Sequence, residues 1–354
     1  GVTIYRCPLY LNTRMGGLRR LLTPLTFALN SAPVACLQIL RRRPHVVLAV
    51  EPTLFSAPLA LLAARLVGAK TVLHIQDLEV EAAFAVGHLR KGGALSALAR
   101  LYDRLATRSF DRIITISFKM AERIQRKGVA AEKIHIVRNW VDLEQVGPGK
   151  TSQAYRCELG LKPDDFVVLY SGSIGAKQGV GLLIDAARRL QDQPGVVFAI
   201  AGQGPMRGEV EAAAQGLPNL RVFDFAPEAR YGEFLSVADA HVLPQEREVA
   251  DLMLPSKLGG MLASGRQCLV TAEAGTELAD FLGESCILTP PGDAEALARA
   301  VMALRHGVYD TTQEAERLRR AATLSKTAGL KAFSEAALGW PQSAEAFAPA
   351  AQEA

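Results

Sequence analysis

The sequence predicts an α/β protein with two doubly wound domains, each built on a parallel sheet. Three observations support this fold class. Runs of β-branched and apolar residues alternate with helical patterns along almost the whole chain, which is typical of parallel sheets with helices on both faces. The alternation breaks at a glycine- and proline-rich stretch near residues 142–150 and then resumes. A length of 354 residues, 49% of them hydrophobic, suffices for two cores of ordinary size.

The elements of the first domain follow from local composition. Short runs rich in Val, Ile and Leu predict strands, and stretches with apolar residues three and four positions apart predict helices. The strands are expected over residues 2–7, 45–50, 71–76, 112–117 and 133–138, and the helices over 54–66, 95–108 and 119–127. Because the chain starts at Gly1 and enters a strand-like run at once, we expect the natural protein to have more sequence before this point.

Residues 21–40 form a long apolar segment in the same domain. Asn30, Ser31 and two prolines interrupt it, and basic clusters flank it at both ends. These features predict an amphipathic surface segment rather than a membrane span. The alternative is a helix packed in the core, with its arginines in solvent.

The second domain shows the same alternation. Its strands are expected over residues 166–171, 196–201, 220–225, 241–243, 267–271 and 286–288, and its helices over 179–191, 206–215, 228–237, 276–281 and 294–304. The domain boundaries are therefore placed at 1–147 and 148–338, followed by a disordered tail over 339–354 that is rich in Ala, Glu, Gln, Ser and Pro. Two such domains are expected to face each other across a cleft at the carboxyl ends of their sheets.

Composition excludes several classes of function. The net charge of +4 arises from 40 basic and 36 acidic residues, an excess too small to indicate a nucleic acid partner. The five cysteines are scattered and lack metal-type spacing, which indicates a reducing compartment and no structural zinc. The sequence contains no recognisable Ser/His/Asp nucleophile arrangement and no recognisable carboxylate-rich metal site.

The stretch 251–265 is the strongest candidate for a phosphate site. Pro255 suits the first position of a helix and Gly265 the position just past its end, so a helix is predicted over 255–264. The free amides at Ser256 and Lys257, with a hydroxyl and an ammonium, could bind a phosphate group. The alternative is an ordinary helix packed on a sheet, with Lys257 in solvent.

Two glycines within this predicted helix also require an explanation. Gly259 and Gly260 each cost about 1 kcal/mol relative to alanine. A cost of this size predicts that backbone or ligand approaches the helix closely there.

Two glycine-rich turns follow strands of the second domain. The first contains Gly172, Ser173 and Lys177 between a strand and a helix, so its amides and the lysine could meet a phosphate. The second contains Gly202 and Gly204, whose amides could contact a base or a ribose. Either sequence would also suit a plain tight turn between strand and helix.

Polar residues stand at the end of one strand of the first domain. Strand alternation puts His74 and Gln76 on the same side, and the chain leaves the sheet at Asp77. Such a cluster could bind a sugar or serve in acid/base chemistry, although Asp77 could instead cap the next helix. In the second domain, Asp251 lies close enough to Pro255 to be a further candidate, whereas 246–248 is typical of a solvated charge run.

Together these motifs resemble the two-domain GT-B glycosyltransferases of the retaining, family-4 type. The matching segments, in the family's order, are 139–142, 170–187, 201–205 and 254–265. The chain is similar in particular to colanic-acid and exopolysaccharide glycosyltransferases, through the signatures at 6–10, 74–77 and 170–172. The likeness extends to about residue 338.

This resemblance implies two Rossmann-like domains, the second binding a nucleoside diphosphate sugar and the first an acceptor. It implies transfer of a hexose or deoxyhexose, with retention, to a sugar hydroxyl on a lipid-linked carrier in cell-surface polysaccharide biosynthesis. No metal ion or other cofactor is expected. The protein would be cytoplasmic and peripheral to the inner membrane, with the segment 19–43 against anionic lipid. The last helix, at 333–340, would cross back onto the first domain.

The resemblance also assigns roles to the candidate residues. The groups expected to hold the diphosphate are Ser256, Lys257, Lys177 and the amides around Ser173. His74 and Asp77 would position sugar or acceptor, and Asp251 would bind donor hydroxyls.

The sequence departs from the family pattern in three places. Many relatives carry a pair of glutamates eight positions apart where Leu252 and Gly260 stand, and a lysine where Gln178 stands. Relatives also begin with βα units that this chain lacks. Two alternatives therefore stay open: a non-catalytic GT-B-fold partner in polysaccharide assembly, and an inverting or non-transferase relative such as a sugar-nucleotide epimerase.

Overall fold

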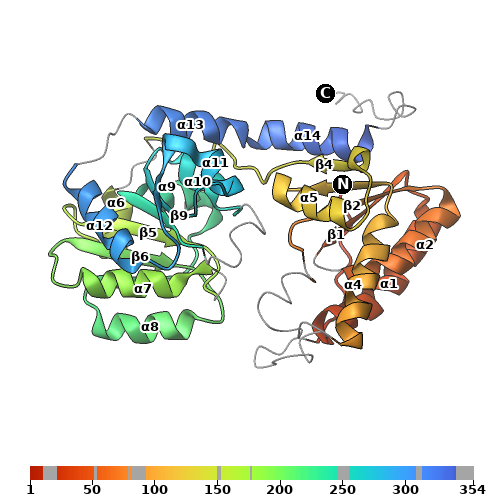
Figure 1. Ribbon diagram of the computed structural model, residues 1–354, viewed down its shortest axis with the longest axis horizontal. Coiled ribbons are helices and arrows are strands. Elements are labelled where there is room, and N and C mark those ends of the chain that lie inside the picture. Colours follow the sequence, from red (N-terminus) through yellow and green to blue (C-terminus); the bar gives the residue numbers. More distant parts are fainter. Residues whose placement is uncertain are drawn as a thin grey trace. The chain divides into compact units, whose positions relative to one another are not determined.

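The computed structural model describes residues 1–10, 22–51, 54–78, 80, 93–149, 153–175, 178–245, 255–307 and 313–339. The chain forms two compact α/β units (Figure 1). The first combines residues 1–138 with 329–354, and the second comprises residues 139–328. The predicted fold class, two α/β domains with parallel sheets, is confirmed.

The first unit contains a four-stranded parallel sheet in the order β1-β2-β3-β4. Its strands are β1 (Val46–Glu51), β2 (Lys70–Ile75), β3 (Arg112–Thr115) and β4 (Ile134–Ile136). Its helices are α1 (Leu22–Arg42), α2 (Ala57–Val67), α4 (Ala94–Arg108) and α5 (Phe118–Arg126), with short 3-10 turns η2 (Leu54–Ser56) and η3 (Ala131–Lys133). Ser117 caps α5 by accepting a hydrogen bond from the amide of Met120. Every strand predicted between residues 45 and 138 is present.

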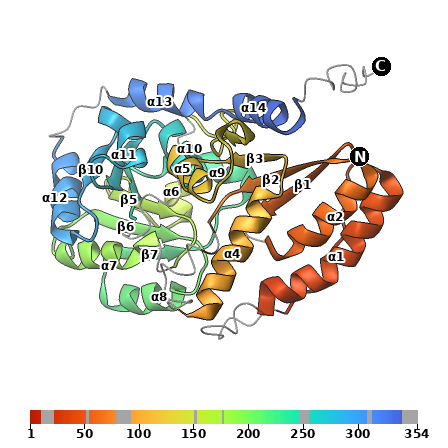
Figure 2. The ribbon, with the colours of Figure 1, turned by 45° about the vertical axis from the view of Figure 1, so that its right-hand side comes forward.

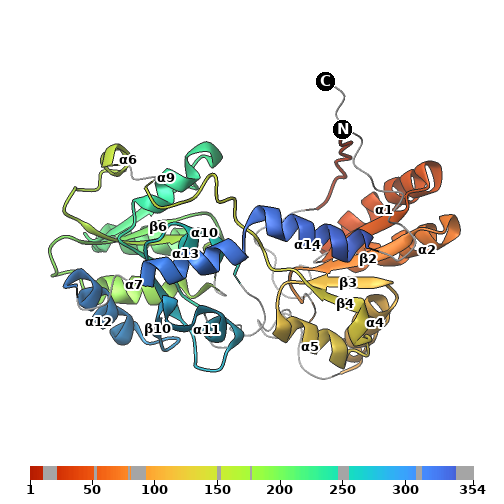
Figure 3. The same ribbon diagram turned by 90° about the horizontal axis from the view of Figure 1, so that it is seen from above.

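The last helix, α14 (Lys326–Leu338), contributes all but its first three residues to the first unit. Arg112 of β3 donates hydrogen bonds to the carbonyls of Glu335, Ala336 and Gly339, at 3.3, 2.8 and 2.8 Å. A guanidinium at these carbonyls donates to acceptors at the helix end and complements the helix dipole. The expected return of the final helix to the first domain is therefore present (Figure 3).

The strand predicted at the start of the chain is not present. Residues 2–7 form no strand, and the side chains of Val2 and Ile4 are 91% and 73% exposed. This segment lies beside α1, where the Tyr10 amide donates to Thr26 Oγ1 at 3.0 Å, and so it finds no neighbouring strand. Residues 22–42 form one continuous helix despite Pro33, and this helix is long and apolar enough to span a membrane by length and composition alone.

The second unit contains a six-stranded parallel sheet in the order β10-β9-β8-β5-β6-β7. Its strands are β5 (Phe166–Ser171), β6 (Val196–Ala201), β7 (Leu220–Phe223), β8 (Ala240–Leu243), β9 (Gln267–Thr271) and β10 (Ile287–Thr289). Its helices are α6 (Gln153–Glu158), α7 (Val180–Arg189), α8 (Arg207–Gly216), α9 (Tyr231–Ser236), α10 (Leu258–Ala263), α11 (Glu277–Leu282), α12 (Ala294–Arg305) and α13 (Gln313–Thr323), with 3-10 turns η5 (Glu228–Arg230) and η7 (Gly283–Ser285).

Helices cover both faces of this sheet, as Figure 1 shows with α7 and α8 on one side and α10 and α11 on the other. Strand alternation sends Val167 and Leu169 of β5 into one core, together with residues of α9, α10 and α11. It sends Val168 and Tyr170 into the other core, with residues of α7, α8 and α12. Because these strands are buried on both faces, their sequences are continuous apolar runs rather than an alternation of apolar and polar residues.

The boundary between the units lies at Arg138/Asn139 rather than at 147/148. The glycine- and proline-rich stretch packs on the second unit instead of linking freely. The Val141 amide donates to the Leu324 carbonyl at 2.8 Å, and the side chain of Val146 is only 2% exposed. A Cβ built on Gly232 would lie 1.9 Å from the Gln145 carbonyl oxygen, so α9 and this stretch are in direct backbone contact.

Candidate functional site

A pocket of about 270 Å³ opens at the carboxyl edge of the second sheet. Strand β5 has β6 on one side and β8 on the other, so the order of the strands reverses at the β5/β8 pair. Ligands of doubly wound sheets bind at this switch point. The pocket is lined by Gly172, Ser173, Gln178, Phe225, Leu243, Pro244, Gln245, Pro255, Ser256 and Lys257.

Lys257 contributes an ammonium group to this pocket. Its Nζ is buried and has no hydrogen-bond partner within the described chain. It lies 3.8 Å from the centroid of the Tyr170 ring, a cation–π contact that stabilises the charge only partly. Burial lowers the pKa of Lys257 to about 7. A buried donor without an acceptor is costly, and an anionic ligand would supply the acceptor.

Tyr170 connects this lysine to the loop after β5. Its hydroxyl donates to the carbonyl of Ser173 at 2.6 Å, and its side chain is fully buried. Burial raises the pKa of Tyr170 well above its usual value, so the hydroxyl stays protonated. The Tyr170 ring therefore holds the Lys257 ammonium, and its hydroxyl holds the loop that carries Gly172 and Ser173.

Gln245 contributes a buried acceptor to the same pocket. Its backbone amide and carbonyl both bond to Thr271 Oγ1, at 2.7 and 3.1 Å, which fixes the chain just after β8. Its side-chain Oε1 is buried and has no partner among the described residues. The pocket thus offers a cation from Lys257 and a hydrogen-bond acceptor from Gln245, a combination that suits a ligand with both an anionic group and a hydroxyl.

Three predicted glycines allow the loops to approach one another. A Cβ on Gly172, where φ is +153°, would lie 2.9 Å from Lys257 Nζ. A Cβ on Gly202 would lie 1.8 Å from the Gly172 carbonyl oxygen, and one on Gly204 would lie 2.2 Å from the Ile174 carbonyl oxygen. Gly202 and Gly204 do not line the pocket, so in this structure their role is to let the β6–α8 loop support the β5–α7 loop.

Helix α10 is shorter than predicted. It covers only Leu258–Ala263, and residues 255–257 form a turn in which the Leu258 amide bonds to the Pro255 carbonyl at 3.1 Å. The six-residue helix supplies little dipole, so the Lys257 side chain must provide most of the positive charge. The atoms that approach its glycines most closely belong to side chains rather than to backbone or ligand: a Cβ on Gly259 would lie 3.1 Å from the Val141 side chain, and one on Gly260 would lie 3.0 Å from the Tyr231 hydroxyl.

The structure brings four of the eight residues predicted to bind the donor to one pocket, namely Gly172, Ser173, Ser256 and Lys257. Lys177 and Asp251 lie outside the described residues. Within the described ranges, no three His, Cys, Asp or Glu side chains gather closely enough to hold a metal ion.

His74 and Asp77 belong to the first unit. His74 lies in β2, and Gln76 donates from Nε2 to its Nε2 at 2.8 Å, which confirms that both side chains lie on the same side of the strand. The His74 ring meets Phe333 of α14 edge-on, with centroids 5.1 Å apart. Burial lowers the pKa of His74 and favours the neutral ring, which can accept the Gln76 hydrogen bond. Asp77 is half buried, just past the end of the strand.

The sequence places Gln245 only in the run 245–248 that could face the cleft, and it assigns no role to Tyr170 or Phe225. These three residues line the pocket or support it. Phe225, 51% exposed, follows β7 and offers an aromatic face. The missed signal for Gln245 is its position: it is the polar residue two places after a strand of four buried residues, at the edge where ligands of such sheets bind.

Comparison with protein families shows that both units match glycosyltransferase models. Residues 1–140 match the model described as a glycosyl transferase 4-like domain, and residues 165–306 match the one described as glycosyl transferases group 1.

Two curated relatives show how far the similarity extends. WcaI of Escherichia coli, which carries the name of a colanic acid biosynthesis glycosyl transferase, is 39% identical over 312 residues, covering 84% of this chain and 75% of WcaI. The amylovoran biosynthesis glycosyltransferase AmsK of Erwinia amylovora is 26% identical over 215 residues. That alignment covers 59% of this chain and 51% of AmsK, so the chain spans about half of this second relative.

Solved structures share the fold. Sucrose-phosphate synthase from Thermosynechococcus elongatus superposes with a TM-score of 0.68 at 16% identity, covering 87% of this chain and 76% of that one. HepE of Anabaena in complex with UDP superposes with a TM-score of 0.66 at 14% identity, covering 87% and 80%. At these identities the likeness establishes the two-domain fold.

Proposed function

The chain belongs to the glycosyltransferases that combine a glycosyl transferase 4-like domain with a group 1 domain, and on this premise we propose its reaction and site. It transfers a hexose or deoxyhexose from a nucleoside diphosphate sugar to a sugar hydroxyl, with retention of the anomeric configuration. The acceptor is a lipid-linked glycan of a cell-surface polysaccharide, as the names of WcaI and AmsK suggest. The protein works in the cytoplasm, at the surface of the membrane.

One observation carries the proposal: the Lys257 ammonium, which has no hydrogen-bond partner among the described residues, stands in a pocket at the β5/β8 switch point. A diphosphate would give this ammonium the anionic acceptor that it lacks. The donor sugar or ribose would offer a hydroxyl to Gln245 Oε1, and the half-exposed ring of Phe225 would offer a stacking surface to the base.

The same ammonium would act during the reaction. Negative charge grows on the nucleoside diphosphate as its bond to the anomeric carbon breaks, and a fixed cation in a dry pocket stabilises this charge more than it stabilises the bound donor. Retention requires the acceptor hydroxyl to attack from the face that the leaving group vacates. We propose that Lys257 supplies the charge that a metal ion would otherwise supply, so that a chelator leaves turnover unchanged.

The remaining candidates keep their predicted roles within this proposal. His74 and Asp77 of the first unit position the sugar or the acceptor. Lys177 joins Lys257 at the diphosphate, and Asp251 binds donor hydroxyls.

The experiment is a thermal-shift screen of this chain against UDP, GDP, ADP and their sugars, without metal. A ligand that binds only the folded state raises the unfolding temperature, so we expect one nucleoside diphosphate to do so. No shift with any of them would favour a non-catalytic assembly partner.

With the donor identified, release of the free nucleoside diphosphate tests transfer, and the anomeric configuration of the product separates retention from inversion. Interconversion of donor sugars without release would instead indicate an epimerase.

Donor affinity is expected to fall as the pH rises above 7. The diphosphate binds the protonated form of Lys257, so binding raises a pKa that burial has lowered to about 7 in the free protein. Below that pH the lysine is already charged and affinity is at its maximum. Above it, binding must take up a proton, and the Kd should rise by up to about tenfold per pH unit until the pKa of the complex is reached.

Titration calorimetry with the identified nucleotide sugar, in buffers of different ionisation enthalpy, measures this proton uptake directly. The Lys257→Met variant is the matched control, because it should bind weakly with no such pH dependence. A wild-type Kd that stays constant between pH 7 and 9 would show that this lysine does not meet the phosphates.

Replacing Gln245 with methionine is expected to raise the KM for the donor about tenfold. The substitution keeps the volume of the side chain but removes the acceptor, which leaves a ligand hydroxyl without its partner. Thermal stability should stay constant or rise, since the buried Oε1 of Gln245 has no partner among the residues that the structure describes. Steady-state kinetics and a melting curve check both parts. An unchanged KM would exclude Gln245 from donor recognition.

A further inference from the structure

We propose that Cys268 and Cys286 are a redox modification site, at which hydrogen peroxide forms a reversible disulfide bond within the second unit. Cys268 lies in β9, and Cys286 directly precedes β10. Their side chains are 0% and 5% exposed and belong to the core that contains residues of α9, α10 and α11. The proposed sugar transfer uses neither thiol. The bond would link the stability of the second unit to the supply of peroxide.

The strand register places the two cysteines side by side. Strands β9 and β10 are parallel, and Leu269 pairs with Ile287. Cys268 and Cys286 each stand one residue earlier, so they are opposite each other on strands about 4.8 Å apart, with both side chains in the same core. Their thiols already share a hydrogen bond. A disulfide needs its Cα atoms about 4.4–6.8 Å apart, so this bond can form with little movement of either strand.

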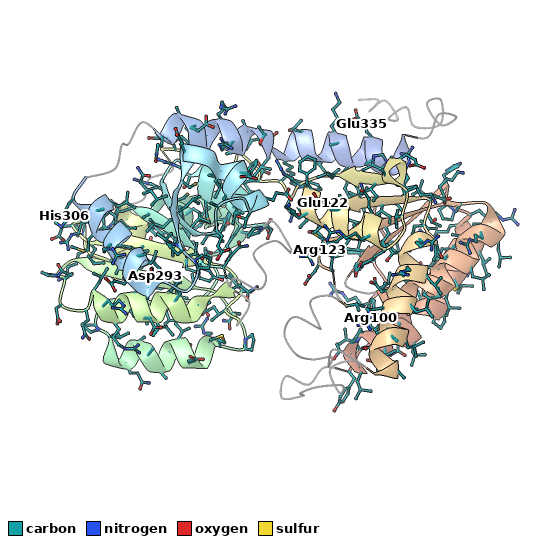
Figure 4. All side chains as sticks on the ribbon, viewed as in Figure 1. Arg100, Glu122, Arg123, Asp293, His306 and Glu335 are labelled. Carbon is teal, nitrogen blue, oxygen red and sulfur yellow. The ribbon has the colours of Figure 1, made fainter. Side chains whose placement is uncertain are left out.

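The edge strand β10 is held at both ends. Before it, Arg317 of α13 donates from Nη1 to the Ser285 carbonyl and to Gln267 Oε1, both at 3.1 Å. Gln267 and Ser285 are the residues that directly precede the two cysteines. Beyond the other end of β10, Asp293, which Figure 4 labels, caps α12 by accepting from the Ala296 amide at 2.8 Å. These contacts keep the two sulfur atoms together in the folded unit.

The surroundings of the pair make Cys286 the more reactive thiol. The Cys268 thiol donates to the Cys286 sulfur, which holds the pKa of Cys286 below its usual value. The Ser285 hydroxyl, 3.6 Å from this sulfur, and the guanidiniums of Arg317 and Arg320 act in the same direction. The hydrogen bond to Cys286, together with burial, raises the pKa of Cys268 well above its usual value. Since the thiolate is the nucleophile, Cys286 attacks the oxidant and Cys268 completes the disulfide.

A small oxidant can reach the pair. Strand β10 is the edge strand of the second sheet, beside α11 (Figure 2). A cavity of about 300 Å³ is lined by Arg317 and by Gln267, which directly precedes Cys268. Glu284, in the turn η7 that leads to Cys286, is exposed. A short edge strand opens locally at a small cost in free energy. Hydrogen peroxide, little larger than water, can therefore enter, whereas a bulky oxidant such as glutathione disulfide is excluded.

The reaction with hydrogen peroxide needs no other reactant. The Cys286 thiolate attacks one peroxide oxygen, and the O–O bond breaks. Hydroxide leaves and takes up the proton that Cys286 had released, which gives a sulfenic acid at Cys286 and one water. The Cys268 thiol then attacks the Cys286 sulfur. The S–S bond forms, the S–O bond breaks, and the departing hydroxide takes the Cys268 proton as a second water. Two thiols lose two electrons, and a dithiol reductant returns them.

Peptide mapping of the full chain tests this proposal. Trypsin cleaves after Arg266 and next after Arg299, so one peptide, residues 267–299, contains both cysteines. Excess hydrogen peroxide on the folded protein should lower the mass of this peptide by two hydrogen atoms and block its alkylation, and dithiothreitol should reverse both changes. The unfolding temperature of the oxidised protein should rise by roughly 5 °C or more, because the bond closes a loop of the unfolded chain.

Single substitutions separate the roles of the two thiols. Cys268→Ser should accumulate the sulfenic acid at Cys286, which dimedone traps, whereas Cys286→Ser should leave Cys268 unlabelled. Cys157→Ser is the matched control, because Cys157 is exposed on α6, outside the pair. That variant should form the disulfide as the wild type does.

The wild-type experiment remains decisive even if a variant does not fold. A peptide 267–299 that stays fully open to alkylation, or that gains oxygen atoms instead of losing hydrogen, would overturn the proposal. So would a disulfide that forms only after the chain has been unfolded, because the folded strands would then not bring the thiols together. An oxidised protein that melts below the reduced one would contradict the proposed fit of the bond between β9 and β10.

Discussion

Replacing Lys257 with methionine is expected to lower the turnover of sugar transfer by roughly two to three orders of magnitude, the loss typical when one preorganised group that stabilises transition-state charge is removed. Methionine keeps an unbranched apolar stem over the Tyr170 ring and deletes only the ammonium. The KM for the donor should also rise, because the ammonium binds the diphosphate in the ground state as well.

The Lys257→Met variant should be more thermally stable than the wild type, although its turnover is lower. Within the described chain the ammonium has no hydrogen-bond partner, and its lowered pKa means that the folded state disfavours the charge. The unfolded chain binds more protons than the folded chain between about pH 7 and the ordinary lysine pKa of about 10.4, so wild-type stability should increase with pH across this window. The methionine variant should lack this increase and melt at a higher temperature at pH 7.

Release of the nucleoside diphosphate, followed at saturating donor, measures turnover, and calorimetry measures melting. Lys162→Met is the matched control, because that lysine is exposed on a loop of the same unit and should affect neither. If the Lys257→Met variant keeps wild-type turnover, Lys257 does not bind the donor diphosphate as proposed.

Replacing Gly202 with alanine is expected to destabilise the second unit by about 4 kcal/mol or more, enough to prevent its folding at 37 °C in a protein of ordinary stability. The new Cβ would lie 1.8 Å from the Gly172 carbonyl oxygen, a backbone atom that cannot rotate away. The backbone of Gly202 is also at φ +148°, which L-residues rarely adopt.

Gly208→Ala is the matched control for this prediction. Gly208 lies in α8, a few residues along the chain, and nothing stands within 4 Å of the position its Cβ would take. This substitution should raise the free energy of unfolding by about 0.5–1 kcal/mol, because glycine is a poor helix former. Chemical denaturation measures both variants. A Gly202→Ala protein within about 1 kcal/mol of wild type would mean that the two loops do not meet in solution.

The sequence predicts the second sheet well because its strands are buried on both faces. Residues 196–201 are all buried, and a run of valine, phenylalanine, isoleucine and alanine is compatible with little other than a central strand. Residues 2–7 also contain β-branched and apolar residues, but a strand needs a neighbour to satisfy its backbone groups. That requirement is tertiary, and local composition does not reveal it.

Helix α13 escaped prediction for a different reason. Its inner face is anchored by Arg317, which is 2% exposed and donates to the carbonyls of Gly265 and Ser285 and to Gln267 Oε1. A buried arginine takes the place of an apolar residue, so the usual spacing of hydrophobic residues is missing from the sequence.

The candidate site was predictable to the extent that it lies within continuous motifs. Gly172, Ser173, Ser256 and Lys257 stand in glycine-rich or proline-led turns whose composition indicates free amides and charge. Gln245 has no such motif around it. Its place in the same pocket as Lys257 depends on β8 pairing with β5, a neighbour that the order of strands along the chain does not reveal.

The return of α14 to the first unit has a consequence for synthesis on the ribosome. Residues 1–138 emerge first, yet Arg112 meets its carbonyl acceptors, and His74 its aromatic neighbour, only when residues 333–339 have been made. The second unit is continuous in sequence and can close earlier. The amino-terminal part of this enzyme is therefore finished last, and a premature stop codon just after residue 328 would leave the second unit whole while depriving the first of its cover.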